Sequence, residues 1–122
     1  MLAEQPLLKN FPSDFRYVLG LQEASVVGMA DGYAQAVRNA AITVLHTDVG
    51  TGNGMGNIIT AYLNKSPLIV IAGQQTREML IGDPLLTNRE ATQLPKPYIK
   101  WSYEPYRAED VPAALVCTLH VF

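Results

Sequence analysis

Apolar and polar positions along this chain predict buried strands that alternate with helices. From residue 22 to residue 38 the apolar side chains recur close to helical spacing. Two runs rich in β-branched residues, 41–46 and 68–73, predict buried strands. Because strands separated by helices at this spacing form parallel sheets, the pattern predicts an α/β fold with right-handed crossovers.

Three weaker patterns add an element near each end of the chain. Residues 16–20 form a short apolar run that predicts a strand, and residues 98–103 alternate like a strand with one polar face. Residues 109–120 predict a C-terminal helix, with Glu109 and Asp110 favourable at its positive end.

The middle of the chain is rich in glycine and proline. Glycines between positions 50 and 56 predict a turn, followed by a helix over residues 57–64. That helix should not continue into Ser66-Pro67, because the residue before a proline disfavours the helical region. Residues 74–97 predict a long irregular segment, and such a segment in a small domain usually serves function or an interface.

Composition limits the class of protein. The chain has 122 residues, 48% hydrophobic and 16% charged, which fits a single domain with one core. So little charge indicates either strands buried on both faces or a surface covered by another chain, and both explanations stay open. The net charge of −2 without a basic run argues against nucleic acid or membrane as a partner. A single cysteine and no signal-peptide pattern favour the cytoplasm.

Two titratable residues are candidates for chemistry. Glu23 opens a helix among apolar neighbours, so it is either a glutamate that favours the helix dipole or a carboxyl held in an apolar site and suited to proton exchange. His46 ends a predicted parallel strand, where α/β sheets bind ligands, although a structural role is equally open. The glycines that follow fall at every second position and match neither a dinucleotide fingerprint nor a P-loop.

A set of longer motifs goes further than spacing. The chain contains, in this order, LQEASVVGMADGYAQA, LHTDVGTGNGMG, SPLIVIAGQQTR, LLTNREATQLPKP and KWSYEP. Together these motifs resemble the pyrimidine-binding domain of thiamine-diphosphate-dependent 2-oxo-acid decarboxylases, and most of all the benzoylformate decarboxylase type. The resemblance implies a three-layer αβα fold with a parallel sheet, and thiamine diphosphate as the cofactor.

The resemblance also implies roles for individual residues. Glu23 matches the glutamate that hydrogen-bonds a ring nitrogen of the aminopyrimidine, and His46 matches a histidine that transfers protons on the substrate side. The residues implied to lie against the cofactor and a dimer partner are Gly50, Thr51, Gly52 and Asn53. The segment with Gln93, Leu94 and Lys96 matches a structural divalent-cation site, but Gln93 and Lys96 replace the Asn and Arg of the relative, which weakens that prediction.

Other departures concern what the chain contains. Thr47, Asp48 and Val49 stand where the family usually has small residues, and the Asp48 carboxylate is expected to act on His46 or to repel an anionic substrate. By resemblance, residues 1–122 form one incomplete domain that lacks its first and last strands. The family's Gly-Asp-Gly…Asn motif for Mg²⁺ and diphosphate is absent, since Asp31 belongs to a lookalike inside a predicted helix.

We therefore expect a chain that is inactive alone. It should form a homo-oligomer or associate with a diphosphate-binding domain, and act on a small 2-oxo acid. Two alternatives stay open: an acetolactate synthase or oxalyl-CoA decarboxylase type of the same superfamily, or a non-catalytic paralogue that dimerises. Cofactor binding, rather than oligomeric state, separates the catalytic and non-catalytic readings.

Overall fold

The computed structural model describes residues 8–121, and two parallel strands lie at its centre. Strand β1 (Ala41–Leu45) pairs with β2 (Leu68–Ala72), with Ala41 opposite Leu68 and Leu45 opposite Ala72. Both strands are built of the apolar, largely β-branched runs that favour extended backbone. The two predicted strands and their parallel direction are confirmed, but their burial is partial, because Ile42 of β1 is exposed and Ile69 is the one buried residue of β2.

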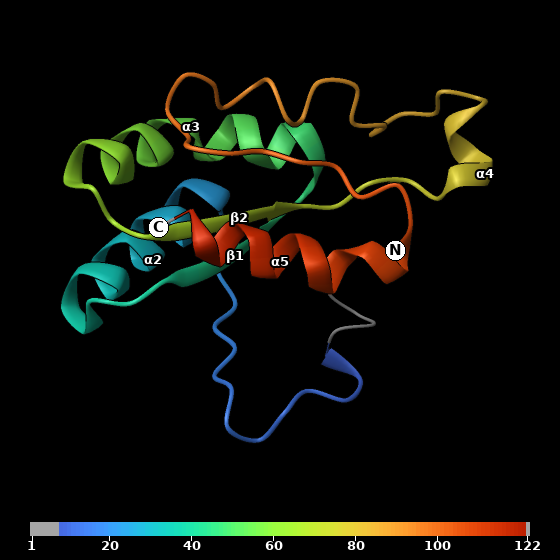
Figure 1. Cartoon of the computed structure of the whole chain (residues 1–122). Coiled ribbons are helices and arrows are strands. Elements are labelled where there is room, and N and C mark those ends of the chain that lie inside the picture. Colours follow the sequence, from blue (N-terminus) through green and yellow to red (C-terminus); the bar gives the residue numbers. More distant parts are fainter. Residues whose placement is uncertain (1–7, 122) are drawn as a thin grey trace.

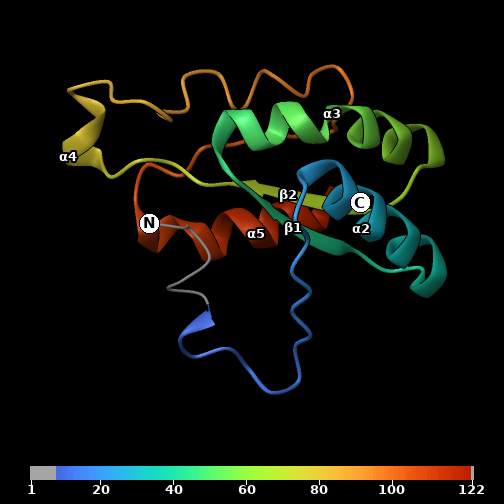
Figure 2. The ribbon, with the colours of Figure 1, turned by 180° about the vertical axis from the view of Figure 1, so that it is seen from behind.

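Helices α2 (Glu23–Val37) and α3 (Thr47–Asn64) pack together against one face of this sheet (Figures 1 and 2). The side chains of Val27, Leu45 and Ile58 form the buried core between them. Each is at most 3% exposed. The core is therefore small and lies between α2, β1 and α3.

A third layer lies on the other side of the sheet. The short 3₁₀ turn η1 (Ala108–Asp110) leads into helix α5 (Val111–His120), and the two opposite views place α5 across the sheet from α2 (Figures 1 and 2). This arrangement confirms the predicted three-layer αβα fold. None of the residues of α5 is buried, so this layer is only loosely attached.

The glycine-rich turn predicted between positions 50 and 56 is wrong. Helix α3 begins at Thr47 and runs through all four glycines. The close packing of α3 gives the reason, because a Cβ on Gly54 would lie 3.0 Å from Val27 Cγ2. Tertiary contact thus overrides the weak helix propensity of glycine. The helix ends at Asn64, with Lys65 as a left-handed cap ahead of Pro67, as the proline predicted.

Two predicted strands are also wrong. Residues 16–20 and 98–103 are irregular. Val18, Leu19 and Leu21 are 61%, 72% and 94% exposed, and the blue ribbon of Figure 1 shows this segment running away from the sheet. An extended apolar segment becomes a strand only when a neighbouring backbone completes its hydrogen bonds, and here neither segment pairs with the described sheet.

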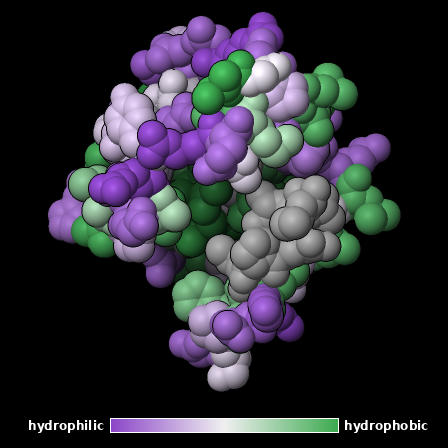
Figure 3. Space-filling view, turned by 90° about the vertical axis from the view of Figure 1, so that its right-hand side faces the viewer, coloured by the Kyte–Doolittle hydropathy of each residue, from purple (hydrophilic) through white to green (hydrophobic). Residues whose placement is uncertain are grey.

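The predicted irregular segment 74–97 is confirmed, apart from the single turn of helix α4 (Arg77–Leu80). Much apolar surface stays exposed, including Ile81 at 92% and Leu85 at 87%. Figure 3 shows hydrophobic surface on the floor of a hollow, with hydrophilic groups along its upper rim. Within residues 8–121 the search for a helix able to cross a membrane finds none.

Candidate functional site

The carboxyl ends of both strands meet the start of α3. His46 follows β1 directly and forms the N-cap of α3, and it is partly buried. Gly73 follows β2, and its N–H donates to the Leu45 carbonyl at 3.3 Å. Parallel α/β sheets bind ligands at this edge, because the helices that follow the strands begin there. His46 therefore lies where the pattern of strands predicted it.

Glu23 reaches the first turns of α3 from the first turn of α2. Its carboxylate Oε2 accepts a hydrogen bond from Asn53 Nδ2 at 3.3 Å. A Cβ on Gly50 would lie 3.1 Å from Glu23 Oε1, so the glycine leaves room for the carboxylate. Glu23 is partly buried and also lies at the positive end of α2. The position of Glu23 thus agrees with a glutamate that favours the helix dipole, whereas an apolar site suited to proton exchange stays a prediction.

The other predicted cofactor residues divide into two groups. The Gly50 N–H donates to the His46 carbonyl at 2.7 Å, which ties the glycine next to Glu23 to the histidine. Thr51 is buried and donates its hydroxyl to the Thr47 carbonyl at 3.1 Å, while Gly52 faces open space. Glu23, Gly50 and Asn53 are therefore brought together, and His46 is joined to them through its backbone carbonyl, whereas Thr51 faces the interior.

The start of α3 carries local strain. Thr47 has a φ of 56°, in the left-handed region that a β-branched residue disfavours. Among residues 8–121, Thr47 Oγ1 and Asp48 Oδ1 are the buried side-chain atoms without a hydrogen-bond partner. Thr47 and Asp48 belong to the tract of residues 47–49, where the resemblance led us to expect small residues.

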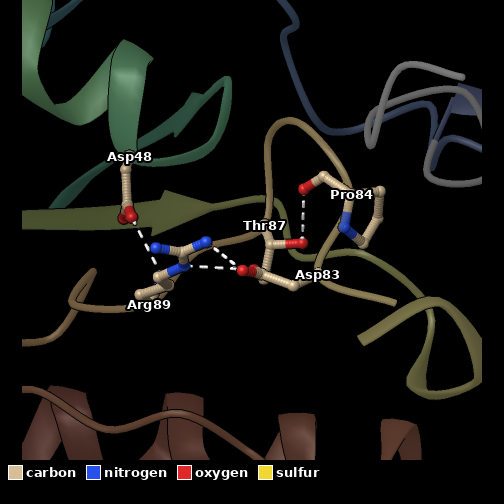
Figure 4. A network of polar contacts seen from close by, with 5 residues as sticks. All are labelled: Asp48, Asp83, Pro84, Thr87 and Arg89. Atoms are coloured by element: carbon tan, nitrogen blue, oxygen red, sulfur yellow. Dashed lines mark hydrogen bonds and ion pairs between the residues drawn. The ribbon is translucent and has the colours of Figure 1, made fainter. Parts of the chain in front are cut away.

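Asp48 connects α3 to the irregular segment. Its backbone N–H donates to Asn88 Oδ1 at 2.6 Å, and its carboxylate Oδ2 accepts from the Arg89 N–H at 3.2 Å. The Arg89 guanidinium pairs with the Asp83 carboxylate (Figure 4). The Asp48 carboxylate is thus engaged by the loop, an arrangement that the sequence did not suggest.

An open cavity of about 500 Å³ borders this network. Its lining combines leucine and proline with charged groups from the loop and from the start of α3: Asp48, Asp83, Pro84, Leu85, Leu86, Thr87, Arg89 and Glu90. Asn88, which holds the loop in place, is only 6% exposed. Sequence reasoning missed Asn88, because an asparagine in an irregular segment has the same pattern as an ordinary turn residue.

The predicted cation segment follows shortly after Glu90, which lines the cavity, and is largely exposed. Gln93, Leu94 and Lys96 are all at the surface, and Gln93 Nε2 donates to Thr92 Oγ1 at 3.4 Å. A search of the described residues finds no group of three or more His, Cys, Asp or Glu able to hold a metal. The assignment of a cation to this segment stays a prediction.

The Glu23 region suits a nitrogen heterocycle such as an aminopyrimidine. A carboxyl is the side chain that can exchange a proton with a ring nitrogen, and Asn53 fixes its orientation. The glycine at position 50 keeps the space beside Oε1 free of a side chain. The residues present therefore fit the pyrimidine half of thiamine diphosphate.

Comparison with known proteins identifies close relatives. The chain is 55% identical over 112 residues to benzoylformate decarboxylase of Pseudomonas aeruginosa, covering 92% of this chain and 21% of that protein. The crystal structure of benzoylformate decarboxylase from Polynucleobacter necessarius matches with a TM-score of 0.91 and 59% identity, over 97% of this chain and 22% of that one. The acetolactate synthase large subunit of Haemophilus influenzae is 30% identical over 99 residues, covering 81% of this chain and 17% of that protein.

These matches cover only part of each relative, and they agree on one family. The chain spans about one fifth of the length of the relatives it matches. The model of the thiamine pyrophosphate enzyme family, N-terminal TPP binding domain, matches residues 3–94. The chain therefore belongs to the thiamine pyrophosphate enzymes and corresponds to their N-terminal TPP-binding domain.

Proposed function

We propose that this chain forms the pyrimidine-binding half of the active site of a benzoylformate decarboxylase-type enzyme. The reaction is the non-oxidative decarboxylation of an aromatic 2-oxo acid to an aldehyde and carbon dioxide. The observation that carries the proposal is the partly buried Glu23 carboxylate, which accepts a hydrogen bond from Asn53 and packs closely against Gly50, where a Cβ would lie 3.1 Å from Glu23 Oε1. The activity named for the relatives at 55% and 59% identity supports the choice of substrate class.

Each of the gathered residues has a role in this proposal. Thiamine diphosphate, when bound, would supply the electron sink that takes up the electron pair of the broken carbon–carbon bond as carbon dioxide leaves. Glu23 holds and exchanges a proton at the pyrimidine ring nitrogen, with Asn53 setting the direction of its carboxylate. His46, at the strand end next to the first turn of α3, moves a proton on the substrate side. Gly50, Thr51, Gly52 and Asn53 form the wall of backbone against the cofactor.

The remaining parts of the enzyme belong to the same proposal. We assign Mg²⁺ and the diphosphate to a domain other than the one formed by residues 1–122, of which residues 8–121 are described. The chain then works in the cytoplasm, as part of an oligomer or beside a diphosphate-binding domain, and is inactive alone. Steady aldehyde formation from benzoylformate by the chain alone would contradict this last point.

Calorimetric titration of thiamine diphosphate with Mg²⁺ tests the proposal directly. We expect the wild type to bind and Glu23→Gln to bind about tenfold more weakly or worse, because a hydrogen bond to a charged group is lost. Glu78→Gln is the matched control, since Glu78 is an exposed carboxyl in α4. Equal affinity of wild type and Glu23→Gln would show that Glu23 does not contact the cofactor.

A second candidate stays within the superfamily. The 30% identity to an acetolactate synthase large subunit supports a synthase-type or oxalyl-CoA decarboxylase-type reaction on the same half-site. The third reading is a non-catalytic paralogue that associates through its exposed apolar side chains. If neither the wild type nor Glu23→Gln binds the cofactor, this third reading takes precedence.

A further inference from the structure

We infer that Asn88 and Asp48 are positioning residues: they clamp the loop of residues 83–90 to the carboxyl edge of the sheet, beside His46. The inference rests on the proposed function, because only a catalytic role of His46 gives the clamp a purpose. That purpose is to hold one wall of the cavity at a fixed position relative to His46. We define the clamp as Asp48, Gln74 and Asn88 with the hydrogen bonds between them and their neighbours.

Asn88 joins both strand ends at once. Its side-chain Nδ2 donates to the carbonyl of Gly73, at the end of β2, and its Oδ1 accepts from the N–H of Asp48, just beyond β1. Its backbone N–H donates to Gln74 Oε1 at 3.0 Å, and its carbonyl accepts from Gln74 Nε2 at 2.9 Å. A single side chain, 6% exposed, thus fixes the loop to two elements.

The Asp48 N–H has a particular need for this partner. It lies in the first turn of α3, where backbone donors have no carbonyl within the helix. The N-cap residue His46 makes no side-chain capping hydrogen bond. Asn88, forty residues further along the chain, therefore supplies the missing acceptor. The Asp48 carboxylate makes a second hydrogen bond to the loop, because it accepts from the backbone N–H of Arg89, as Figure 4 shows.

Backbone strain indicates that the loop is held rather than relaxed. Between residues 8 and 121, five residues other than glycine have positive φ, and two of them, Arg38 and Lys65, are ordinary helix C-caps. The other three, Thr47, Asp83 and Leu86, lie around the clamp, and Leu86 reaches a φ of 73°. Leucine rarely adopts this conformation unless its surroundings impose it.

The clamp therefore helps to set where Leu85 and Leu86 lie, together with Gln75, whose Nε2 donates to the Leu85 carbonyl at 3.1 Å. Both leucines line the cavity, and Leu85 is 87% exposed, so neither is held by burial alone. Because Asp48 lines the same cavity two residues after His46, a shift of the loop would change the distance between the leucine wall and the histidine. In this inference Asn88 and Asp48 act through the loop and do not touch the reacting atoms.

Amide hydrogen exchange of the full chain, followed by NMR, tests the clamp one bond at a time. We expect Asn88→Ala to speed exchange at the Asp48 amide about tenfold or more, since its acceptor is removed. Asp48→Ala should do the same at the Arg89 amide, whereas Asp48→Asn keeps an acceptor oxygen and should restore protection. The Ala41 amide, which donates to the Pro67 carbonyl at 3.1 Å, reports on the sheet and should not change.

Two further signals separate positioning from simple structural support. In Asn88→Ala the Leu86 Cα chemical shift should move as its backbone relaxes, and the ring signals of His46 should shift. The only other histidine, His120, lies on α5 and serves as the internal control. Thr60→Ala is the matched control variant, because Thr60 bonds only within α3 to the Gly56 carbonyl at 2.9 Å.

Three results would overturn the inference. One is faster exchange at Ala41 together with Asp48, which would show general loss of structure. The others are an unchanged Leu86 signal and an unchanged His46 signal in Asn88→Ala. None of these readouts needs the cofactor. Failure of thiamine diphosphate to bind would therefore count against the proposed function and leave the evidence for the clamp intact.

Discussion

At the scale of single residues, Asp31 shows how a carboxylate is kept inside this small core. It lies in α2, is 7% exposed, and accepts hydrogen bonds from Gln35 Nε2 at 3.0 Å, Asn64 Nδ2 at 2.9 Å and the Ser66 hydroxyl. Burial raises the pKa of Asp31, but the three hydrogen bonds outweigh it and leave the pKa below its usual value. Asp31 thus joins α2 to the end of α3.

This shift makes a prediction about acid stability. Because the folded pKa of Asp31 is lowered, its contribution is complete above the ordinary value of 3.8 and is lost as the pH falls through the folded value. Asp31→Asn should cost about 1–3 kcal/mol in free energy of unfolding at about pH 7, and the cost should shrink at about pH 3. Urea denaturation at both values measures it, with exposed Asp14→Asn as the control. A cost that stays constant with pH would contradict the prediction.

At the scale of elements, α3 determines how closely the layers approach. Its glycines fall on two sides: Gly50 and Gly54 face Glu23, Val27 and the end of β1, whereas Gly52 and Gly56 face open space. The same tract therefore combines positions where a side chain is excluded with positions where glycine is merely tolerated. This distinction separates the contribution of packing from that of helix propensity.

Alanine substitutions at these glycines should have opposite effects. Gly52→Ala and Gly56→Ala should stabilise the chain by about 0.5–1 kcal/mol each, because alanine favours the helix and meets nothing. Gly54→Ala should destabilise it by about 1–2 kcal/mol, because its Cβ would lie 3.0 Å from Val27 Cγ2 and the overpacking exceeds the helical gain. Urea denaturation of the three variants measures the difference. Equal effects would indicate that α3 does not pack as described.

The elements also show which parts of the fold the sequence could predict and which parts it could not. Strands β1 and β2 and helix α2 were evident, because their apolar side chains recur at the spacing that burial requires. The start of α3 was not, because glycine propensity argues for a turn and only the contact with Val27 reverses it. Residues 16–20 and 98–103 have strand-like sequences, but pairing depends on a neighbour that local sequence does not reveal.

The same reasoning applies to the site. Glu23 and His46 could be placed by position, at a helix start and a strand end. Asn53 was implied only by resemblance, and its bond to Glu23 became evident in the fold. Asn88 could not be found, because it acts across forty residues through a loop without periodicity. Interactions that are distant in sequence and polar in character leave little trace in a pattern of apolar residues.

At the scale of the whole molecule, stability is distributed unevenly. The buried residues lie in α2, β1, α3 and β2, with Asn88 and Pro95 in the segment after them, while α5 buries none of its own. Elements with few buried apolar contacts open before the rest of a domain does. The described chain thus consists of a packed body and a more weakly held C-terminal helix.

Hydrogen exchange should reveal this division. We expect the amides of α5 to exchange at least about tenfold faster than those of β1 and β2, because opening α5 exposes little new apolar surface. The comparison needs only the wild-type chain at a concentration where it is monomeric. Equal protection of α5 and the strands would mean that α5 opens together with the body.

The extended segment around residues 15–21 has a consequence for the chain in concentrated solution. Tyr17, Val18 and Leu19 favour β-structure and stand exposed, and the described sheet has only two strands, so both of its edges lack a described neighbour. Such a segment can pair with the sheet edge of another copy, which is the first step of strand exchange and of fibril growth. A strand from another chain that covered the same sheet edge would suppress both.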